Sequence, residues 1–267
     1  MPSTVALLCE RWSLTVGEPF QPGGRTAWVA PVRDSSGAEL VLKVGWRHPE
    51  AAHEADGLRE WAGDGAVLLH DAVDFNDTTA LLLERCWPGT TLASREQPEQ
   101  DRVIAGLLRR LWREPAPGHD FRSLKEMCDA WADAFEDKVE SAAVPPDAGL
   151  ARAALTLFRE LPAGAERNVL LCTDLHAENV LAAGREPWLV IDPKPFVGDP
   201  HYDVLQHMLN CPARLQAEPR RLAERMANLA ELDADRVVLW LFTRCLLESV
   251  SPEFAHLGEV ARLLAPT

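Results

Sequence analysis

The stretch Leu170–Gly198 decides the fold, and it reads L-L-C-T-D-L-H-A-E-N-V-L-A-A-G-R-E-P-W-L-V-I-D-P-K-P-F-V-G. Two short apolar runs in this stretch predict strands, and polar residues follow each of them. Asp174 and Asn179 stand five positions apart on one loop, and Asp192 ends the second strand. Phosphoryl transfer needs one carboxylate that faces the acceptor hydroxyl, and hard oxygen ligands that hold Mg²⁺. The stretch therefore predicts phosphoryl-transfer chemistry.

Each polar residue of the stretch has an expected role. Asp174 is the candidate general base, which also orients the acceptor hydroxyl, and a carboxylate with an ordinary pKa suffices in a loose transition state. Asn179 and Asp192 are the candidate Mg²⁺ ligands, with phosphate oxygens and water completing the shell. His176 either donates a hydrogen bond to the transferred phosphate or braces the loop, and both interpretations stay open.

Further segments carry a family resemblance. They are G-G-R-T-A-W-V-A-P-V-R (23–33), L-V-L-K-V (40–44), H-E-A-D-G-L-R-E-W (53–61), L-L-L-E-R (81–85), E-P-W-L-V-I-D-P-K (186–194) and G-D-P-H-Y-D (198–203). With the loop, they make nearly the whole chain similar to the aminoglycoside phosphotransferase superfamily of antibiotic kinases. The resemblance is strongest to the branch of streptomycin 6-kinases and hydroxyurea phosphotransferases.

The resemblance implies an α+β, protein-kinase-like fold of two lobes. A small β-rich N-lobe with one helix is expected over residues 1–86, where it binds nucleotide. A larger, mainly helical C-lobe is expected over residues 87–267, with the catalytic loop, the metal ligands and the acceptor site. Pro88-Gly89 lies in the linker between the lobes because this pair breaks both helical and strand periodicity.

The pattern of apolar and turn-forming residues predicts the remaining elements. Strands are expected at 12–16, 27–33, 40–44, 66–70 and 79–84, with a hairpin turn at 34–37. Helices are expected within 1–10 and at 51–61, 97–113, 123–140, 147–160, 201–210, 217–230, 233–249 and 253–264.

The resemblance also implies the nucleotide-binding residues. Lys43 lies in the middle of a predicted strand, and it corresponds to the kinase lysine that binds nucleotide phosphates and pairs with a helical glutamate, here Glu54. Gly23 and Gly24 lie where kinases cover the phosphates with a glycine-rich loop, although the full G-x-G-x-x-G pattern is absent. Two further residues at the start of the linker are expected to contribute to nucleotide binding: Glu84, which directly precedes it, and Cys86, which lies within it.

The end of the deciding stretch limits the acceptor. Only five residues separate Asp192 from Gly198, so no protein-kinase activation segment fits, and a small-molecule acceptor is expected. Cys172 replaces the histidine that usually opens this loop, and it is expected to pack as a small apolar residue. Asp203 is expected to anchor the loop by accepting backbone N–H bonds.

The predicted helix 123–140 carries two stripes. Leu124, Cys128, Trp131 and Phe135 repeat at helical spacing and are expected to be buried. An acidic stripe shares the same period and includes Asp129 and Asp133; it forms either a solvated face or a face toward a cationic acceptor. A further candidate for the acceptor site stands near the end of an apolar helix, and it is Glu248.

Composition limits the partners and the compartment. A net charge of −14 excludes nucleic acid as the expected partner and suits a cationic small molecule. No apolar run spans a membrane and no secretory signal opens the chain, so a cytoplasmic location is expected. The six cysteines are scattered singly, as in a reducing compartment, and both a monomer and a homodimer are compatible with the sequence.

The sequence thus predicts an enzyme that uses ATP and Mg²⁺ to phosphorylate a hydroxyl group of a streptomycin-like aminoglycoside, which confers antibiotic resistance. Hydroxyurea or another small metabolite, such as an amino sugar, is the alternative acceptor. Two alternatives of other classes are a metallohydrolase built from aspartate and histidine, and a nucleotide-binding protein without catalysis.

Overall fold

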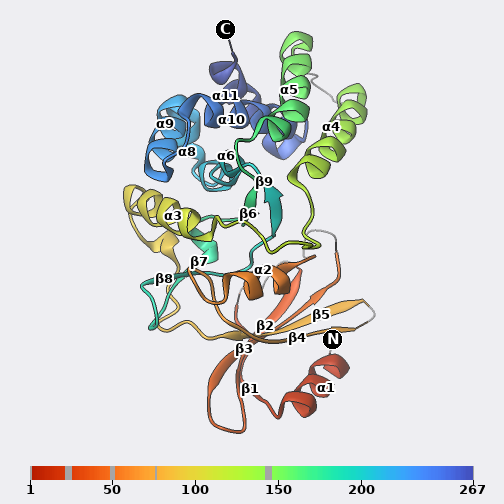
Figure 1. The fold of residues 1–267 in the computed structure, drawn as a ribbon, viewed down its shortest axis with the longest axis vertical. Helices are drawn as coiled ribbons and strands as arrows, with labels where there is room; N and C mark the ends of the chain where they lie inside the picture. Colours follow the sequence, from red (N-terminus) through yellow and green to blue (C-terminus); the bar gives the residue numbers. More distant parts are fainter. Residues whose placement is uncertain (1, 22–25, 49–51, 76, 142–145, 267) are drawn as a thin grey trace. The chain divides into compact units, whose positions relative to one another are not determined.

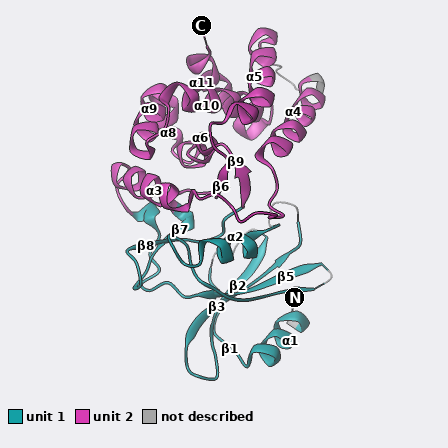
Figure 2. Cartoon of the chain, in the orientation of Figure 1, with its two compact units in different colours: residues 1–94, 178–194 teal, residues 95–177, 195–267 magenta. Residues whose placement is uncertain are grey.

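The chain forms two compact units (Figure 2). The computed structural model describes residues 2–21, 26–48, 52–75, 77–141 and 146–266. The first unit comprises residues 1–94 and 178–194, and the second comprises residues 95–177 and 195–267. A five-stranded sheet dominates the first unit and helices dominate the second, so the predicted α+β class is confirmed. Residues 87–94 and 178–194, expected in the C-lobe, belong to the first unit.

The sheet of the first unit is antiparallel, with strand order β1-β2-β3-β5-β4. The elements of this region are α1 (Pro2–Trp12), β1 (Thr15–Val16), β2 (Ala27–Arg33), β3 (Glu39–Trp46), α2 (Glu54–Trp61), β4 (Leu69–Phe75) and β5 (Thr78–Glu84) (Figure 1). The turn after β2 forms as expected: Asp34 accepts hydrogen bonds from the backbone N–H groups of Ser36 and Ala38, and Gly37 has a φ of 88°. Such a left-handed position favours glycine.

Two predicted strands were placed wrongly. Trp12 belongs to the end of α1, and the strand begins only at Thr15. The strand predicted at 66–70 begins at Leu69 and continues to Phe75. Ala66 makes an isolated parallel bridge to Val190 instead. The apolar run that begins at Ala66 therefore pairs with a segment more than 100 residues away. The local periodicity of a sequence does not reveal such long-range pairing.

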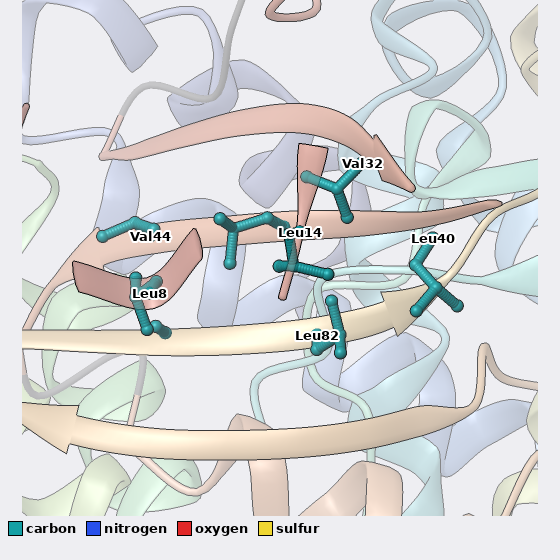
Figure 3. Close-up of a cluster of buried hydrophobic side chains, with 8 residues drawn as sticks. Leu8, Leu14, Val32, Leu40, Val44 and Leu82 are labelled. Atoms are coloured by element: carbon teal, nitrogen blue, oxygen red, sulfur yellow. The ribbon is translucent and has the colours of Figure 1, made fainter. Parts of the chain in front are cut away.

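Helix α1 covers one face of the sheet and closes a hydrophobic core. Leu8 of the helix and Leu14 lie against Val32, Leu40, Val44 and Leu82 (Figure 3). These side chains alternate along β2, β3 and β5, since successive strand residues point to opposite faces. Lys43 lies between two residues of this buried row and therefore points to the other face of the sheet.

Strands β7 (Val180–Ala182) and β8 (Trp188–Val190) form a hairpin in the first unit. The backbone N–H of Val67 donates to the carbonyl of Val190, and the N–H of Val190 donates to Gly65. These bonds attach β8 to the segment that follows α2, so the residues after β8 lie within the first unit.

The second unit is built around α10 (Ala234–Glu248), which is buried along most of its length. Asp233 caps the N-terminus of α10, because its side chain accepts a hydrogen bond from the backbone N–H of Arg236. The other helices and strands of the second unit are α3 (Gln97–Leu111), α4 (Leu124–Ser141), α5 (Ala148–Glu160), β6 (Val169–Leu171), β9 (Phe196–Gly198), α6 (Pro200–Asp203), α7 (Leu205–Leu209), α8 (Pro212–Ala217), α9 (Pro219–Ala230) and α11 (Leu257–Leu264). Helix α10 contacts α5, α6, α7, α9 and α11. Across the described ranges, no helix is both long and apolar enough to cross a lipid bilayer.

Helix α4 corrects one core prediction. Leu124, Cys128 and Phe135 are buried as expected, but Trp131 is 38% exposed. Ala132 takes its place in the buried stripe, because a spacing of four residues keeps it on the same face as Cys128. The helix also approaches β9 so closely that a Cβ atom at Gly198 would lie 2.4 Å from the Cβ of Leu124. Only glycine fits there.

Candidate active site

Lys43 of β3 is held by two carboxylates in the first unit. Its Nζ atom donates to Glu54 Oε1 and Oε2 at 2.7 Å each, and to Asp192 Oδ1 at 2.5 Å. Burial opposes the charged form of Lys43, but the charges of Glu54 and Asp192 outweigh it and raise the pKa of the lysine. Burial raises the pKa of Glu54, and the ammonium of Lys43 opposes that shift. The predicted Lys43–Glu54 pairing is therefore present.

The β7–β8 hairpin brings the two predicted metal ligands to one end of the same ladder. Val180 pairs with Val190, and the next backbone bond runs from the N–H of Ile191 to the carbonyl of Asn179 at 2.9 Å. Asp192 follows directly, with a φ of 53°. A left-handed conformation costs an aspartate energy, and such residues concentrate at functional sites. Asn179 and Asp192 thus emerge from adjacent positions of paired strands.

The donor set fits Mg²⁺. Asp192 offers a carboxylate whose side chain is 49% exposed, and Asn179 offers an amide oxygen on a half-buried side chain. Mg²⁺ uses one or two protein oxygens and completes its octahedral shell with water and substrate phosphates. Within the described part of the chain, no group of three or more histidine, cysteine or acidic residues could hold a metal alone. A site that shares its metal with a phosphate substrate needs only one or two protein ligands, which Asn179 and Asp192 would supply.

Glu84 and Cys86 stand at and just after the end of β5. The Glu84 carboxylate accepts from Arg185 Nε and Nη2 at 3.0 Å each, and from the backbone N–H of Leu68. Burial, and then the charge of Glu84, raise the pKa of the Cys86 thiol to about 11. The Glu84 side chain is thus occupied by hydrogen bonds within the first unit, and the Cys86 side chain is buried. Gly23 and Gly24 lie outside the described residues.

Arg185 is an organising residue that the sequence analysis missed. Besides Glu84, its guanidinium donates to the carbonyls of Gly63 and Ala66. It thereby ties the β7–β8 hairpin to the end of β5 and to the loop after α2. These three partners lie about 100 or more positions away along the chain, so no local pattern pointed to them, although Arg185 also donates to the adjacent Glu186.

In the second unit, Asp203 anchors the loop that leads to Asp174. Asp203 Oδ2 accepts from the N–H of Cys172 at 3.0 Å and from Trp112 Nε1 at 2.9 Å, and Oδ1 accepts from the N–H of Thr173 at 2.6 Å. This confirms the predicted anchoring. Thr173 has a φ of 51°, which is costly for a β-branched residue. The carboxylate thus holds a strained turn immediately before Asp174.

Burial of Asp203 raises its pKa to about 6, although its three donors act in the opposite direction. Asp174 and His176 follow the strained turn, and both side chains are half-buried. Cys172 is fully buried, as expected of a small apolar replacement. The loop is therefore rigid on its inner side, while Asp174 and His176 keep part of their surfaces accessible.

The three predicted acceptor-site acids each form an ion pair in the second unit. Asp129 lies 2.6 Å from Lys125 Nζ, and Asp133 lies 2.7 Å from Arg159 Nη2. Glu248 accepts from Arg244, which also donates to the hydroxyl of Tyr202. The first two pairs are exposed and therefore weak. The pair at Glu248 differs from these two, because the guanidinium of Arg244 is buried.

Asp101 forms a second charge cluster that the sequence analysis missed. This buried carboxylate accepts from His207 Nε2 at 2.9 Å, from Arg214 at 2.9 and 3.0 Å and from Arg225 Nε at 2.6 Å. Burial opposes its ionisation, but these hydrogen bonds hold the pKa of Asp101 well below its usual range. The cluster joins α3, α7, α8 and α9 and resembles a structural brace.

Comparison with known proteins identifies the relatives of this geometry. A family model described as aminoglycoside/hydroxyurea antibiotic resistance kinase matches residues 11–253. The chain is 37% identical over 253 residues to a streptomycin 6-kinase from Streptomyces griseus, covering 92% of this chain and 81% of that protein. It is 35% identical over 266 residues to a hydroxyurea phosphotransferase from Kitasatospora aureofaciens, covering 96% and 75% respectively.

A solved structure supports the fold. A thermostable mutant of an aminoglycoside phosphotransferase, in a ternary complex with ADP and hygromycin B, superimposes with a TM-score of 0.60. The match covers 99% of this chain and 100% of the other at 15% identity. At that identity the likeness concerns the fold alone, and it confirms the predicted kinase-like architecture.

Proposed function

Because this chain belongs to the family of aminoglycoside/hydroxyurea antibiotic resistance kinases, we propose that it transfers the γ-phosphate of ATP to a hydroxyl group of a streptomycin-like aminoglycoside. The observation that carries the proposal is the cluster in which Lys43 Nζ contacts Glu54 and Asp192 at 2.5–2.7 Å. The streptomycin 6-kinase relative supports the acceptor class. Phosphorylation of the antibiotic would confer resistance, and it would take place in the cytoplasm, where ATP is available.

The residues of the first unit bind the phosphate donor in this proposal. Lys43 binds phosphate oxygens of ATP, and Glu54 holds the ammonium in place because both of its oxygens accept from it. Asn179 and Asp192 hold Mg²⁺. When bound, the metal neutralises charge on the phosphates. Gly23 and Gly24 stay predicted parts of the phosphate loop, and Glu84 and Cys86 contribute through their backbone at the end of β5.

In this proposal Asp174 orients the acceptor hydroxyl and acts as its general base. As the acceptor oxygen bonds to the γ-phosphorus, the bond to the β–γ bridging oxygen breaks, ADP leaves and Asp174 takes the hydroxyl proton. Asp203 positions Asp174 because it fixes the two preceding backbone N–H groups. His176 either donates to the transferred phosphoryl group or braces the loop, and the variant His176→Asn separates these roles: loss of turnover with an unchanged melting temperature supports the first.

The test is ATP consumption with Mg²⁺ across a panel of acceptors. The panel contains streptomycin, other aminoglycosides, amino sugars and hydroxyurea, and mass spectrometry detects the phosphorylated product. We expect turnover with streptomycin and a mass increase of one phosphoryl group, which NMR then assigns to one hydroxyl. ATP consumption that no acceptor stimulates would overturn the proposal.

Hydroxyurea is the second candidate acceptor, since the relative from Kitasatospora aureofaciens is a hydroxyurea phosphotransferase. The same panel decides between the two, because hydroxyurea is small and uncharged whereas streptomycin carries guanidinium groups.

The two alternatives of other classes are less well supported. A metallohydrolase could use Asp174, His176, Asp192, His201 and Asp203. However, His201 Nδ1 lies 2.6 Å from Asp199, and Asp203 already accepts from three donors. Phosphate release without nucleotide would favour it. A nucleotide sensor would not need Asp174 on a strained and anchored turn, and any Mg²⁺-dependent turnover would exclude it.

A further inference from the structure

A buried arginine stands in the apolar helix α10. The side chain of Arg244 is 7% exposed, and its neighbours along the helix, Thr243 and Cys245, are fully buried. Within the described residues its Nε–H is buried and has no hydrogen-bond partner. Removing a charge from water has a large desolvation cost. A buried ion pair therefore rarely stabilises a protein more than well-packed apolar residues of similar volume would. Stability alone therefore does not explain why Arg244 is there.

Arg244 supports an exposed indole. Its Cζ atom lies 4.6 Å from the centre of the Trp131 ring. Trp131 is displaced from the buried stripe of α4 and keeps 38% of its surface exposed. A guanidinium stacked on an aromatic ring fixes the ring in place. Trp131 is therefore a fixed aromatic surface within the second unit, and not a side chain that moves freely in water.

The same guanidinium holds Glu248. Arg244 Nη2 donates to Glu248 Oε1, and the glutamate side chain is 22% exposed. Glu248 is the last residue of α10, where the partial negative charge of the helix end disfavours a carboxylate. One buried guanidinium therefore contacts both the Trp131 ring and the Glu248 carboxylate.

These groups are connected to the catalytic loop through α6. Arg244 Nη1 donates to the hydroxyl of Tyr202, and the next residue, Asp203, accepts from the N–H groups that precede Asp174. Tyr202 is buried and packs edge-on against Trp240 with ring centres 5.2 Å apart. One four-residue helix thus supports both Arg244 and the loop of Asp174, and sites on such rigid supports hold their geometry well.

We propose that Trp131 and Glu248 form the subsite that recognises the acceptor, with Arg244 as its positioning residue. Trp131 stacks on the face of a sugar or cyclitol ring, and Glu248 accepts hydrogen bonds from an amino or guanidino substituent of that ring. This inference rests on the proposed kinase function and selects a substrate class within it: cyclic polyols that carry basic nitrogen. Hydroxyurea has no ring, so Trp131 adds nothing to its binding.

Steady-state kinetics of Trp131→Ala and Glu248→Gln test the subsite. We expect each variant to raise KM for streptomycin about 10-fold, from the loss of an aromatic contact or of a charge-assisted hydrogen bond. KM for ATP should change less than about twofold, because neither side chain contacts ATP in this proposal. Trp131→Phe should restore most of the affinity, and Arg244→Lys should raise KM for streptomycin with little change in kcat.

Two matched controls come from the same unit. Phe254 is 39% exposed, much like Trp131, and Glu259 pairs with Arg262 on α11. Phe254→Ala and Glu259→Gln should leave both KM values unchanged. Wild-type KM for streptomycin in Trp131→Ala and Glu248→Gln, with turnover intact, would overturn the subsite but leave the proposed function standing. No wild-type turnover on any acceptor would overturn both.

Discussion

The two charge clusters of the molecule are built differently. In the first unit, the carboxylates of Glu54 and Asp192 share one ammonium group, and the Asp192 side chain is 49% exposed. In the second unit, two guanidinium groups and an imidazole surround the carboxylate of Asp101, which is 0% exposed. One cluster thus has more acid than base and an accessible oxygen, while the other has more base than acid and a sealed carboxylate.

This difference indicates what each cluster is for. An accessible carboxylate beside a lysine can exchange partners when a phosphate and a metal arrive, since water already reaches it. A sealed carboxylate with several donors cannot exchange them without unfolding its surroundings. We therefore expect substitutions in the first cluster to change kinetics and substitutions in the second to change stability. The Asp192 and Asp101 variants below test that separation.

The largest expected effect comes from Asp174, an aspartate of the second unit that lies outside its buried cluster. Asp174→Asn should lower kcat by about 10²–10⁴-fold, because in the proposed mechanism the variant lacks the base that takes the acceptor proton. Mg-ATP affinity and the free energy of unfolding should stay at wild-type values. Steady-state assays, calorimetric titration with Mg-ATP and urea denaturation measure the three quantities.

Glu178→Gln is the matched control for Asp174→Asn, since Glu178 is an exposed carboxylate four positions along the same segment. It should retain wild-type kcat. Near-normal kcat in Asp174→Asn would remove Asp174 from the proposed mechanism.

Asp192→Ala should weaken Mg-ATP binding by about 10³-fold, because an anionic metal ligand contributes several kcal/mol. Asn179→Ala should weaken it less, since an amide coordinates without neutralising charge. Lys43 stays paired with Glu54 at 2.7 Å, so the free energy of unfolding should change little. Calorimetry that shows wild-type Mg-ATP affinity for Asp192→Ala would contradict the assignment.

Asp101→Asn should reverse this pattern. It leaves two arginines without their countercharge and removes the hydrogen bond between His207 and the carboxylate, and breaking such a buried network costs about 3–5 kcal/mol of unfolding free energy. The value should lie toward the lower end because the arginine side chains are partly exposed. Urea denaturation measures it, and kcat should be normal at temperatures where the variant is folded.

Asp129→Asn provides the comparison for Asp101→Asn, because the Asp129–Lys125 pair is exposed and should contribute less than about 1 kcal/mol. Equal losses of stability in the two variants would mean that the buried cluster is not a brace.

The sequence predicted the parts of the site that follow from local order. Lys43 and Glu54 were correctly paired because the motif places them on a strand and on the helix that follows it. The anchoring role of Asp203 was also correct. Arg185 and Arg244 were missed, since Arg185 acts through Glu84, Gly63 and Ala66 and Arg244 through Tyr202, which only the fold brings near them. An arginine in the apolar part of a helix, four positions before Glu248, is the signal that could have drawn attention to Arg244.

Periodicity failed where two residues competed for one face. Trp131 and Ala132 both fall near the buried stripe of α4, and the larger residue was predicted to be inside. The protein buries the smaller one and stacks the indole on Arg244. Helical spacing gives the direction of a face but not the space available behind it, which depends on the residues packed there.

Asp203 should make stability depend on pH in a direction opposite to that of Asp101. Its pKa is about 6 in the folded protein and about 3.9 in the unfolded chain, so the folded state holds the proton more tightly. This contribution is present below about pH 4 and is lost as pH rises to 6, a change of at most about 3 kcal/mol. Asp101, whose pKa is lowered, loses its contribution only below its unfolded pKa of about 4.

Asp203→Asn isolates this term. The difference in unfolding free energy between wild type and variant, measured in urea from pH 4 to 6.5, should change across this window, while the contribution of Asp101 cancels. A constant difference would show that Asp203 is ionised in the folded protein throughout.

The smallest expected effect concerns the acidic charge that neither cluster uses. The chain carries a net charge of −14, and Asp129 and Asp133 lie on an exposed helix face in weak ion pairs. Such a surface attracts a cationic acceptor over distances that salt screens, since the Debye length falls from about 10 Å at 0.1 M to about 3 Å at 1 M. KM for streptomycin should therefore rise about threefold between 0.05 and 0.5 M salt, with a smaller change in kcat, whereas KM for hydroxyurea should not respond. Asp129→Asn combined with Asp133→Asn should flatten the salt dependence for streptomycin without altering the contact made by Trp131. If KM for streptomycin is constant across the salt series, the acidic stripe is a solvated face, and recognition then depends on short-range contacts alone.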